Sequence, residues 1–117
     1  MTTAPTDCLF CRIAAGQIPS RKIHEDGEVF AFHDIAPWAP VHFLIIPKAH
    51  IVSLVETTPE QHQAVLGRML ALAPQLAREQ GVSNGFRVVV NNGADGGQEV
   101  QHLHLHVIGG PRPWKRG

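Results

Sequence analysis

Three histidines stand at every second position near the end of the chain, in the segment HLHLHVIGG at 102–110. Successive side chains of a β-strand point to opposite faces, so His102, His104 and His106 are expected to share one face. A row of imidazoles gains little from burial, and histidine both titrates near neutral pH and binds metals. The pattern therefore predicts a metal site or a catalytic row. The alternative is a set of surface histidines on an edge strand.

A glycine-rich loop, NNGADGGQEV at 91–100, comes directly before this strand. Its glycines at 93, 96 and 97 permit positive φ and close backbone approach, which let several N–H groups point at one anion. The loop is not a Walker loop, because no Gly-Lys-Ser/Thr follows, and it is not a dinucleotide fingerprint. We expect it to bind phosphate beside the histidines, although a plain hairpin turn has a similar composition.

Two cysteines, Cys8 and Cys11, have the spacing of half a tetrahedral zinc site, which needs two more ligands such as histidines. A thioredoxin-like redox pair has the same spacing, but that motif belongs near a βαβ unit that this chain lacks. Two buried, inert thiols are the third interpretation.

The chain has eight histidines, a high number for 117 residues. His42 and His50 bracket an apolar segment and, taken singly, each is expected to be an ordinary polar residue. His24 and His62 are expected to be solvated, without a role.

Length and charge limit the class of protein. A chain of 117 residues fits one domain that buries its own core without disulfides. Ten basic and ten acidic residues leave no formal net charge, so neither nucleic acid nor a membrane is expected as a partner, and only the tail PRPWKRG is locally basic. No apolar run has the length of a membrane span, and the start MTTAPTDC lacks the features of a secretory signal. We therefore expect a cytoplasmic protein.

The first half of the chain predicts a short helix and three strands. The helix is expected over CLFCRIAAG at 8–16, with Leu9, Phe10 and Ile13 facing inward. KIHED and EVFAFHDI are expected to form a hairpin around Asp26-Gly27, and APWAP is a loop. The apolar segment VHFLIIP then predicts a strand that Pro47 ends.

A long helix is predicted to start at Thr58, a good N-cap, with Pro59 in its first turn and Gln61 completing a capping box. Pro74 is expected to kink it or end it early, unless the freed carbonyl is satisfied elsewhere, and Gly81 closes it. The inward stripe consists of Val65, Leu66, Met69, Leu72 and Leu76. With GFRVVVNNG and the histidine segment as final strands, the order predicts an α+β domain whose antiparallel sheet is covered by a helix on one face.

The histidine segment also carries a family resemblance. HLHLHVI matches the His-φ-His-φ-His-φ-φ signature of the histidine-triad (HIT) superfamily, and AFHDIAPWAPVHFLIIPKAHI and NNGADGGQEVQHLHLHVIGG make the chain similar to its Hint branch. The resemblance implies one HIT domain over 1–117, with a flexible N-terminus at 1–7 and a tail at 111–117. It also implies an antiparallel sheet of about five strands with one long and one short helix, extended across a homodimer.

Members that this chain resembles hydrolyse nucleoside 5′-phosphoramidates and related acyl-nucleotides, releasing the nucleoside monophosphate and an amine. The resemblance implies that His104 is the nucleophile and forms a nucleotidyl-histidine intermediate. His102 and His106 would orient its ring, bind phosphate oxygens and help protonate the leaving group, and His42 would complete the proton network. General chemistry agrees, because a neutral imidazole is a competent nucleophile and backbone donors can stabilise the phosphate without a metal cofactor.

The ligands implied are purine nucleoside monophosphates such as AMP, with their phosphoramidate or acyl derivatives. Asp34 would hold the ribose hydroxyls. The phosphate would contact Asn91, Gly97, Gln98, Glu99, Val100, His104 and His106. The base pocket would consist of Phe10, Ile13, Ile18, Phe32, His33 and Ile35.

The chain departs from the common pattern at three places. Glu99 stands where some close relatives have a serine that touches the scissile group, so the resemblance does not carry a leaving-group contact over to this side chain, although the backbone contacts there need not change. Members with two such cysteines use two histidines to complete a zinc site. The structural zinc ligands implied here are Cys8, Cys11, His50 and His102, which gives His102 a supporting role. Trp114, in the tail, is implied to reach the partner's pocket.

Three other functions fit the same residues. One is a dinucleoside polyphosphate hydrolase or nucleotidyltransferase on the same fold. Another is a non-catalytic nucleotide-binding protein. The last is an enzyme whose His-x-His-x-His row binds a catalytic metal.

Overall fold

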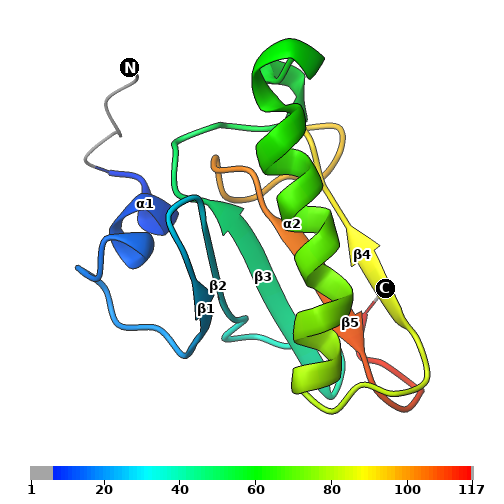
Figure 1. The fold of residues 1–117 in the computed structure, drawn as a ribbon. Helices are drawn as coiled ribbons and strands as arrows, with labels where there is room; N and C mark the ends of the chain where they lie inside the picture. Colours follow the sequence, from blue (N-terminus) through cyan, green and yellow to red (C-terminus); the bar gives the residue numbers. More distant parts are fainter. Residues whose placement is uncertain (1–6, 117) are drawn as a thin grey trace.

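The computed structural model describes residues 7–116, and most of the N-terminus that we expected to be flexible lies outside this range. The elements, in chain order, are α1 (Leu9–Ala14), β1 (Lys22–Glu25), β2 (Val29–His33), β3 (Val41–Pro47), the 3₁₀ helix η1 (Leu54–Glu56), α2 (Pro59–Glu79), β4 (Phe86–Val89) and β5 (Leu105–Gly109). All strand pairs are antiparallel, in the order β1-β2-β3-β5-β4 (Figure 1). The predicted α+β class with a five-stranded antiparallel sheet is confirmed.

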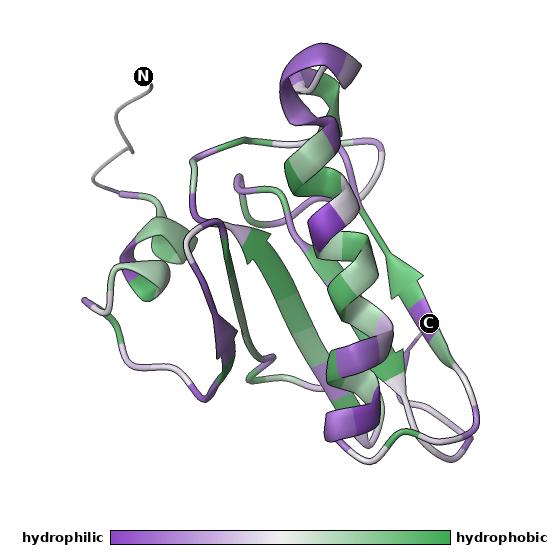
Figure 2. Cartoon of the chain, viewed as in Figure 1, coloured by the Kyte–Doolittle hydropathy of each residue, from purple (hydrophilic) through white to green (hydrophobic). Residues whose placement is uncertain are grey.

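The two faces of the sheet have different covers, with α2 crossing one face over β3 and β5 (Figure 1). Under it, Phe43 and Ile45 of β3 pack with the predicted stripe of α2, of which Met69, Leu72 and Leu76 are buried and Val65 and Leu66 are partly buried. The alternate residues Leu44 and Ile46 pack on the opposite face with residues of α1. Figure 2 shows β3 hydrophobic along most of its length, as expected for a strand buried on both faces.

The start of α2 differs from the predicted capping box. Thr58 caps the helix as expected, since its hydroxyl oxygen accepts a hydrogen bond from the Gln61 N–H at 3.2 Å. The reciprocal bond is made by His62, not by Gln61: His62 Nδ1 accepts from the Thr58 N–H at 2.9 Å. His62 was expected to have no role, but it completes this cap.

The expectation that Pro74 ends α2 early is wrong, because the helix runs on to Glu79. A proline at this position removes the hydrogen bond to the Leu70 carbonyl, four residues earlier. Leu70 lies on the exposed side of the helix, where water can hydrate its carbonyl. Gly81, with φ of 87°, follows the end of the helix as predicted.

Leu9 does not face inward. Phe10 and Ile13 are buried as predicted, but 44% of Leu9 is exposed. Helix α1 has only six residues, and Phe10 and Ile13, three positions apart, occupy the side that faces the sheet. Leu9 therefore points away from the core.

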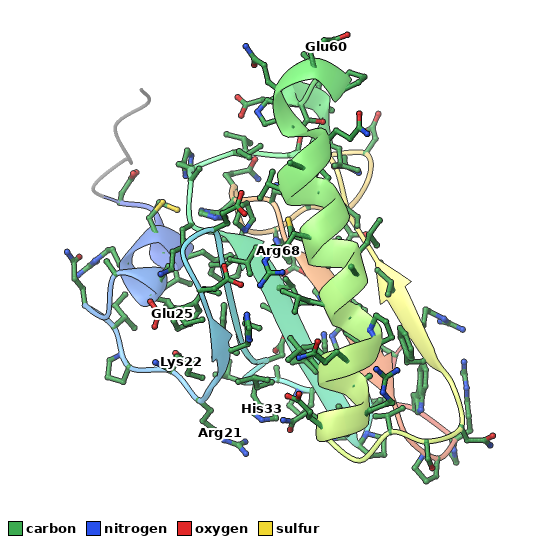
Figure 3. The ribbon with its side chains drawn as sticks, viewed as in Figure 1. Arg21, Lys22, Glu25, His33, Glu60 and Arg68 are labelled. Carbon is green, nitrogen blue, oxygen red and sulfur yellow. The ribbon has the colours of Figure 1, made fainter. Side chains whose placement is uncertain are left out.

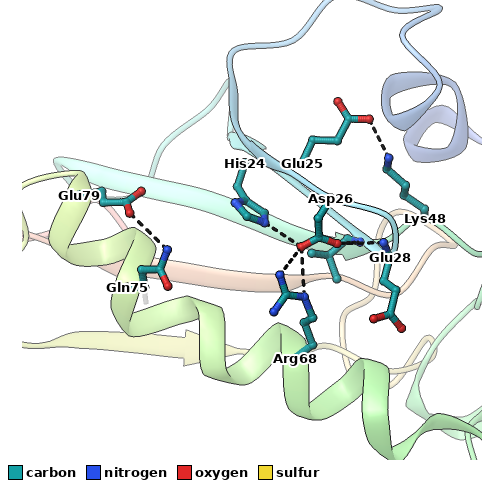
Figure 4. A network of polar contacts seen from close by, with 9 residues as sticks. His24, Glu25, Asp26, Glu28, Lys48, Arg68, Gln75 and Glu79 are labelled. Atoms are coloured by element: carbon teal, nitrogen blue, oxygen red, sulfur yellow. Dashed lines mark hydrogen bonds and ion pairs between the residues drawn. The ribbon is translucent and has the colours of Figure 1, made fainter.

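Asp26 fastens the β1–β2 hairpin to α2. Its Oδ1 accepts hydrogen bonds from the Glu28 and Val29 N–H groups at 2.8 and 3.0 Å, which fixes the predicted turn. Its Oδ2 lies 2.8 Å from His24 Nε2 and 2.6 Å from a guanidinium nitrogen of Arg68 (Figure 4). Figure 3 shows Arg68 on α2. His24, expected to be solvated and idle, is part of this structural network.

The last two strands are shorter than predicted. Residues 90–93 lie beyond the end of β4, and β5 begins only at Leu105. The register pairs Ile45 with Leu105, so Pro47 would face Leu103 if the ladder continued, and proline has no N–H to donate. The Leu103 N–H bonds instead to the Ile51 carbonyl at 2.7 Å. His102 and His104 therefore lie in an extended segment before the strand.

None of the helices in residues 7–116 combines the length and apolar character needed to cross a membrane.

Candidate functional site

His104, His106 and His42 lie on the face of the sheet opposite α2. Between the first two, Leu105 points into the core beneath α2, as strand alternation requires. His42 comes from β3, the strand paired with β5. All three rings are buried, with exposed fractions of 2% for His42, 6% for His104 and 7% for His106. Two adjacent central strands thus bring these rings together.

The hydrogen bond of His104 determines which ring nitrogen is free. Its Nδ1 lies 2.7 Å from the His102 carbonyl oxygen. A carbonyl only accepts, so Nδ1 carries the proton and Nε2 of the neutral ring keeps its lone pair. Burial lowers the pKa of His104. A neutral ring with an unprotonated Nε2 has the form required of a nucleophile.

His42 and His106 form a directional pair. The Trp38 N–H donates to His42 Nδ1 at 3.1 Å, so the proton of the neutral His42 ring is on Nε2. His42 Nε2 donates in turn to His106 Nδ1 at 2.9 Å, which leaves His106 with its proton on Nε2. Burial lowers both pKa values, that of His106 to about 4, so both rings are neutral near pH 7.

Asp34 stands beside this pair. Its Oδ2 lies 3.6 Å from His42 Nε2, and its Oδ1 accepts the Ala36 N–H at 2.8 Å. The carboxylate faces the histidines and also lines the cleft in front of them. Asp34 is thus positioned to contact a ligand in the cleft while its charge acts on His42.

The cleft brings predicted and unpredicted residues together. It is lined by Phe10, Asp34, Ala36, Trp38, Leu44, Asn91, Gly97, Glu99, Val100, His104, His106 and Arg116. Sequence reasoning missed Trp38, whose ring stacks on His106 with 4.9 Å between centroids and 19° between planes. It also missed Arg116. The available signals were a tryptophan between two prolines just before His42 and the basic tail.

The predicted base-pocket residues do not form one pocket. Phe10 lines the cleft, and Phe32 packs against it with ring centroids 5.4 Å apart. Ile13 and Ile18 line a separate hollow between α1 and the β1–β2 hairpin. Ile35 is fully exposed. His33 is partly exposed at the end of β2, where burial first and then the Arg21 charge lower its pKa.

The glycine-rich loop has a fixed shape. Gly93 and Gly97 have φ of 73° and 80°, and a Cβ on Gly96 would collide with the backbone of Asn92. The side chain of Gln98, predicted to contact phosphate, is used inside the loop. Its oxygen accepts the Gly93 N–H at 2.8 Å, and its amide donates to the carbonyls of Val52 and Val100 at 2.6 and 3.0 Å. Gln98 therefore stabilises the loop whose adjacent residues Gly97 and Glu99 line the cleft.

His102 belongs to a different environment, the cysteine cluster beside α1. Its Nδ1 lies 3.2 Å from Cys8 Sγ and 3.5 Å from Cys11 Sγ, and His50 Nδ1 lies 3.3 Å from Cys11 Sγ. The four ligand atoms all lie within 4.8 Å of one another. His50, which alone gave no signal, is part of this group.

The donor set of this cluster fits a metal ion. His102 Nε2 donates to the Pro47 carbonyl at 2.8 Å, so its Nδ1 lone pair faces the sulfurs. Burial lowers the pKa of His102 to about 4 and, together with Cys8, raises that of Cys11 to about 12. A cation would favour the thiolate, and the sulfur–nitrogen distances approach the edge of roughly 3.5 Å of a tetrahedral zinc site. Cys8, Cys11, His50 and His102 can hold a metal ion.

The geometry does not match one metal held by all three histidines of the motif. His102 Nδ1 faces sulfur, whereas His104 uses its Nδ1 to bond the His102 carbonyl and lines the cleft. His106 Nδ1 is engaged by His42. The row therefore divides between two sites.

Comparison with known proteins agrees with this architecture. The family model described as HIT domain matches residues 15–112. The chain belongs to the HIT family. It is 49% identical over 105 residues to protein HitA of Neisseria gonorrhoeae, covering 90% of this chain and 97% of HitA.

Two solved structures extend this comparison. A HIT family hydrolase from Legionella pneumophila is similar with a TM-score of 0.86 and 45% identity, covering 91% of this chain and 95% of the other. A histidine triad protein from Clostridium difficile has a TM-score of 0.89 and 42% identity, with coverage of 95% and 96%. The likeness supports a hydrolase-type HIT protein.

Proposed function

We propose that this HIT protein is a nucleotide-binding hydrolase of the Hint branch. It cleaves the P–N or acyl-phosphate bond of purine nucleoside 5′-monophosphate derivatives, with His104 as covalent nucleophile. The observation that carries the proposal is the bond from His104 Nδ1 to the His102 carbonyl, which leaves Nε2 free on a ring that lines the cleft. His106, also lining the cleft, has its own Nε2–H available.

In the first step, His104 Nε2 attacks the phosphorus of the bound phosphoramidate and forms a P–N bond to the ring. The bond from phosphorus to the amine breaks, and its electron pair stays with the departing nitrogen. The ring becomes a cation, which the His102 carbonyl stabilises through the Nδ1–H. An anionic phosphate beside His106 raises the pKa of that ring, and the protonated ring gives its Nε2 proton to the amine.

In the second step, water attacks the phosphorus of the nucleotidyl-histidine. Neutral His106 takes a proton from the water as the bond to His104 Nε2 breaks, and the nucleoside monophosphate leaves. His42 orients His106 when that ring is neutral, because the His42 Nε2–H then fixes the Nδ1 edge of the ring. The loop containing Gly97 and Val100 offers backbone groups at the cleft for the phosphate oxygens.

The cysteine cluster would hold a structural zinc ion through Cys8, Cys11, His50 and His102. When bound, the ion would fasten α1 to the segment that leads into β5, without taking part in the reaction. His102 would then serve the site through its carbonyl, which orients His104.

The expected homodimer would extend the sheet at an edge strand. Strand β4 is one such edge, and Phe86, its first residue, is 40% exposed. A partner strand there would pair the open backbone groups of the edge.

The test is turnover of an adenosine 5′-phosphoramidate carrying a fluorogenic amine, in the presence of a chelator. We expect wild type to release the amine and His104→Ala to lose about 10³-fold or more in kcat/KM. His24→Ala is the matched control, because His24 contacts Asp26 away from the cleft. Turnover by His104→Ala at the wild-type rate would overturn the proposal. Preferred cleavage of a dinucleoside polyphosphate would favour the alternative substrate class.

A further inference from the structure

We infer that Arg116, in the C-terminal tail, is the cation that binds the substrate phosphate in the cleft. This inference rests on the proposed function, because it assigns a ligand group to the same site. It extends that function to a residue outside the histidine motif and outside the glycine-rich loop.

The tail is held against the loop before β3. The Lys115 N–H donates to the Trp38 carbonyl at 2.6 Å. The Arg116 guanidinium then lies over the Trp38 ring, with Cζ 4.5 Å from the ring centroid. Trp38 itself stacks on His106. The tail thus places a fixed cation on an aromatic ring that is in contact with the catalytic histidines.

The charges around the cleft show why a cation is needed there. The acidic side chains of Asp34 and Glu99 both line the cleft. Among the lining residues that the structure describes, Arg116 supplies the positive charge. Without it, an anionic phosphate would enter a space with two negative charges.

The donors of Arg116 are also available for a ligand. Within residues 7–116, no hydrogen bond or ion pair engages the Arg116 guanidinium. Stacking uses the face of the guanidinium, while its N–H groups project from the edge and suit phosphate oxygens. Arg116 is exposed, so a phosphate can reach it.

Arg112 provides a matched control in the same tail. Its guanidinium also stacks on a tryptophan, with Cζ 3.8 Å from the centroid of the Trp114 ring. That ring belongs to a separate cleft formed by the 81–87 segment and the start of the tail. Trp114 donates to the Gly110 carbonyl of its own chain at 3.0 Å. Substituting Arg112 removes equal charge from the tail but none from the histidine cleft.

The experiment is calorimetric binding of AMP and of adenosine to wild type, Arg116→Ala, Arg116→Lys and Arg112→Ala. We expect Arg116→Ala to weaken AMP binding about tenfold, the loss typical of one hydrogen bond to a charged group. Adenosine binding, which lacks the phosphate, should be unchanged. Arg116→Lys should recover part of the affinity, and Arg112→Ala should match wild type.

Two results would overturn the inference while leaving the proposed function in place. One is AMP binding by Arg116→Ala equal to wild type. The other is an equal loss for AMP and adenosine, which would indicate a structural role of the tail. If wild type itself binds no AMP, the proposed function fails and the assignment of Arg116 fails with it.

Discussion

His102 and His104 are two residues apart in one segment, yet their rings have opposite chemistry. His102 donates from Nε2 to the Pro47 carbonyl and presents Nδ1 to two sulfurs. His104 donates from Nδ1 to the His102 carbonyl and leaves Nε2 free. One ring is arranged as a metal ligand and the other as a nucleophile. Each role depends on which ring nitrogen donates its N–H to a backbone carbonyl, and so leaves the other nitrogen unprotonated. The position of the residue in the motif does not determine the role.

Helix α1 contacts both rings and so connects the two environments. Cys8 and Cys11 face His102, whereas the Phe10 ring meets His104 edge-on with centroids 5.2 Å apart. An ion bound by the cysteines would therefore stabilise the position of the helix that packs on His104. The cysteine cluster and the cleft are chemically separate, but helix α1 packs against both.

The largest expected effect is a difference in unfolding free energy between variants of the two histidines. His102→Ala should lose the bound metal and lower the free energy of unfolding by about 4 kcal/mol or more, because metal binding contributes directly to folding. His104→Ala should keep the metal and lose only about 1–2 kcal/mol, for one hydrogen bond. Metal content and denaturant unfolding of the purified proteins measure both. Equal losses in the two variants would show that the environments are not distinct.

The next effect is a loss of stability in acid. The folded-state pKa of His106 is about 4, below the usual 6.5, because the ring is buried, so the unfolded chain binds more protons between these values. This ring therefore favours folding fully above about pH 6.5, and its contribution is lost as the pH falls toward about 4. Denaturant unfolding across this range should show stability decreasing with acidity. His106→Gln should flatten part of the decrease, and an unchanged slope would contradict the assigned burial effect.

The sequence predicted the sheet and the long helix well because their signals are local. The apolar run 41–47, the Asp26-Gly27 turn and the Thr58 cap each have a strong pattern, and each appears in the structure. The HIT family was also identified correctly from the histidine motif and its flanking segments.

Local patterns say little about contacts between side chains that are distant in sequence. The residues around His50 do not indicate that it meets Cys11, 39 residues away, and only the family resemblance placed it with the cysteines and His102. The tail gave no indication that Arg116 folds back onto Trp38. Gln98 is predicted to contact phosphate, but loop composition did not reveal that its side chain also makes hydrogen bonds to the backbone at Gly93, Val52 and Val100. Tertiary packing decides such contacts.

A smaller effect is expected from Gln98, whose side chain holds the glycine-rich loop in shape. Gln98→Ala removes three hydrogen bonds to backbone groups and leaves the Gly93 N–H without its acceptor. We expect a loss of about 2 kcal/mol in unfolding free energy and a higher KM, with metal content unchanged. Unfolding and steady-state kinetics test this. Normal kinetics would mean that the loop keeps its shape without the Gln98 side chain.

The smallest effect should come from Leu9. It comes directly before Phe10 in α1 but points to solvent, so Leu9→Ala should change the free energy of unfolding by less than about 0.5 kcal/mol. Ile13→Ala, on the buried side of the same helix, should cost about 2–4 kcal/mol. Thermal or denaturant unfolding of both variants gives the comparison. A large cost for Leu9→Ala would mean that this face of α1 is covered in solution.

The central claim is that His104 forms a covalent bond to the nucleotide. The most direct measurement is rapid acid-free quenching of wild type during turnover of the adenosine phosphoramidate, followed by intact-mass and peptide analysis. We predict one nucleotidyl group per chain, located on His104, and none in His104→Ala. A nucleotidyl group on another residue, or full turnover with no adduct under conditions that preserve phosphohistidine, would contradict it.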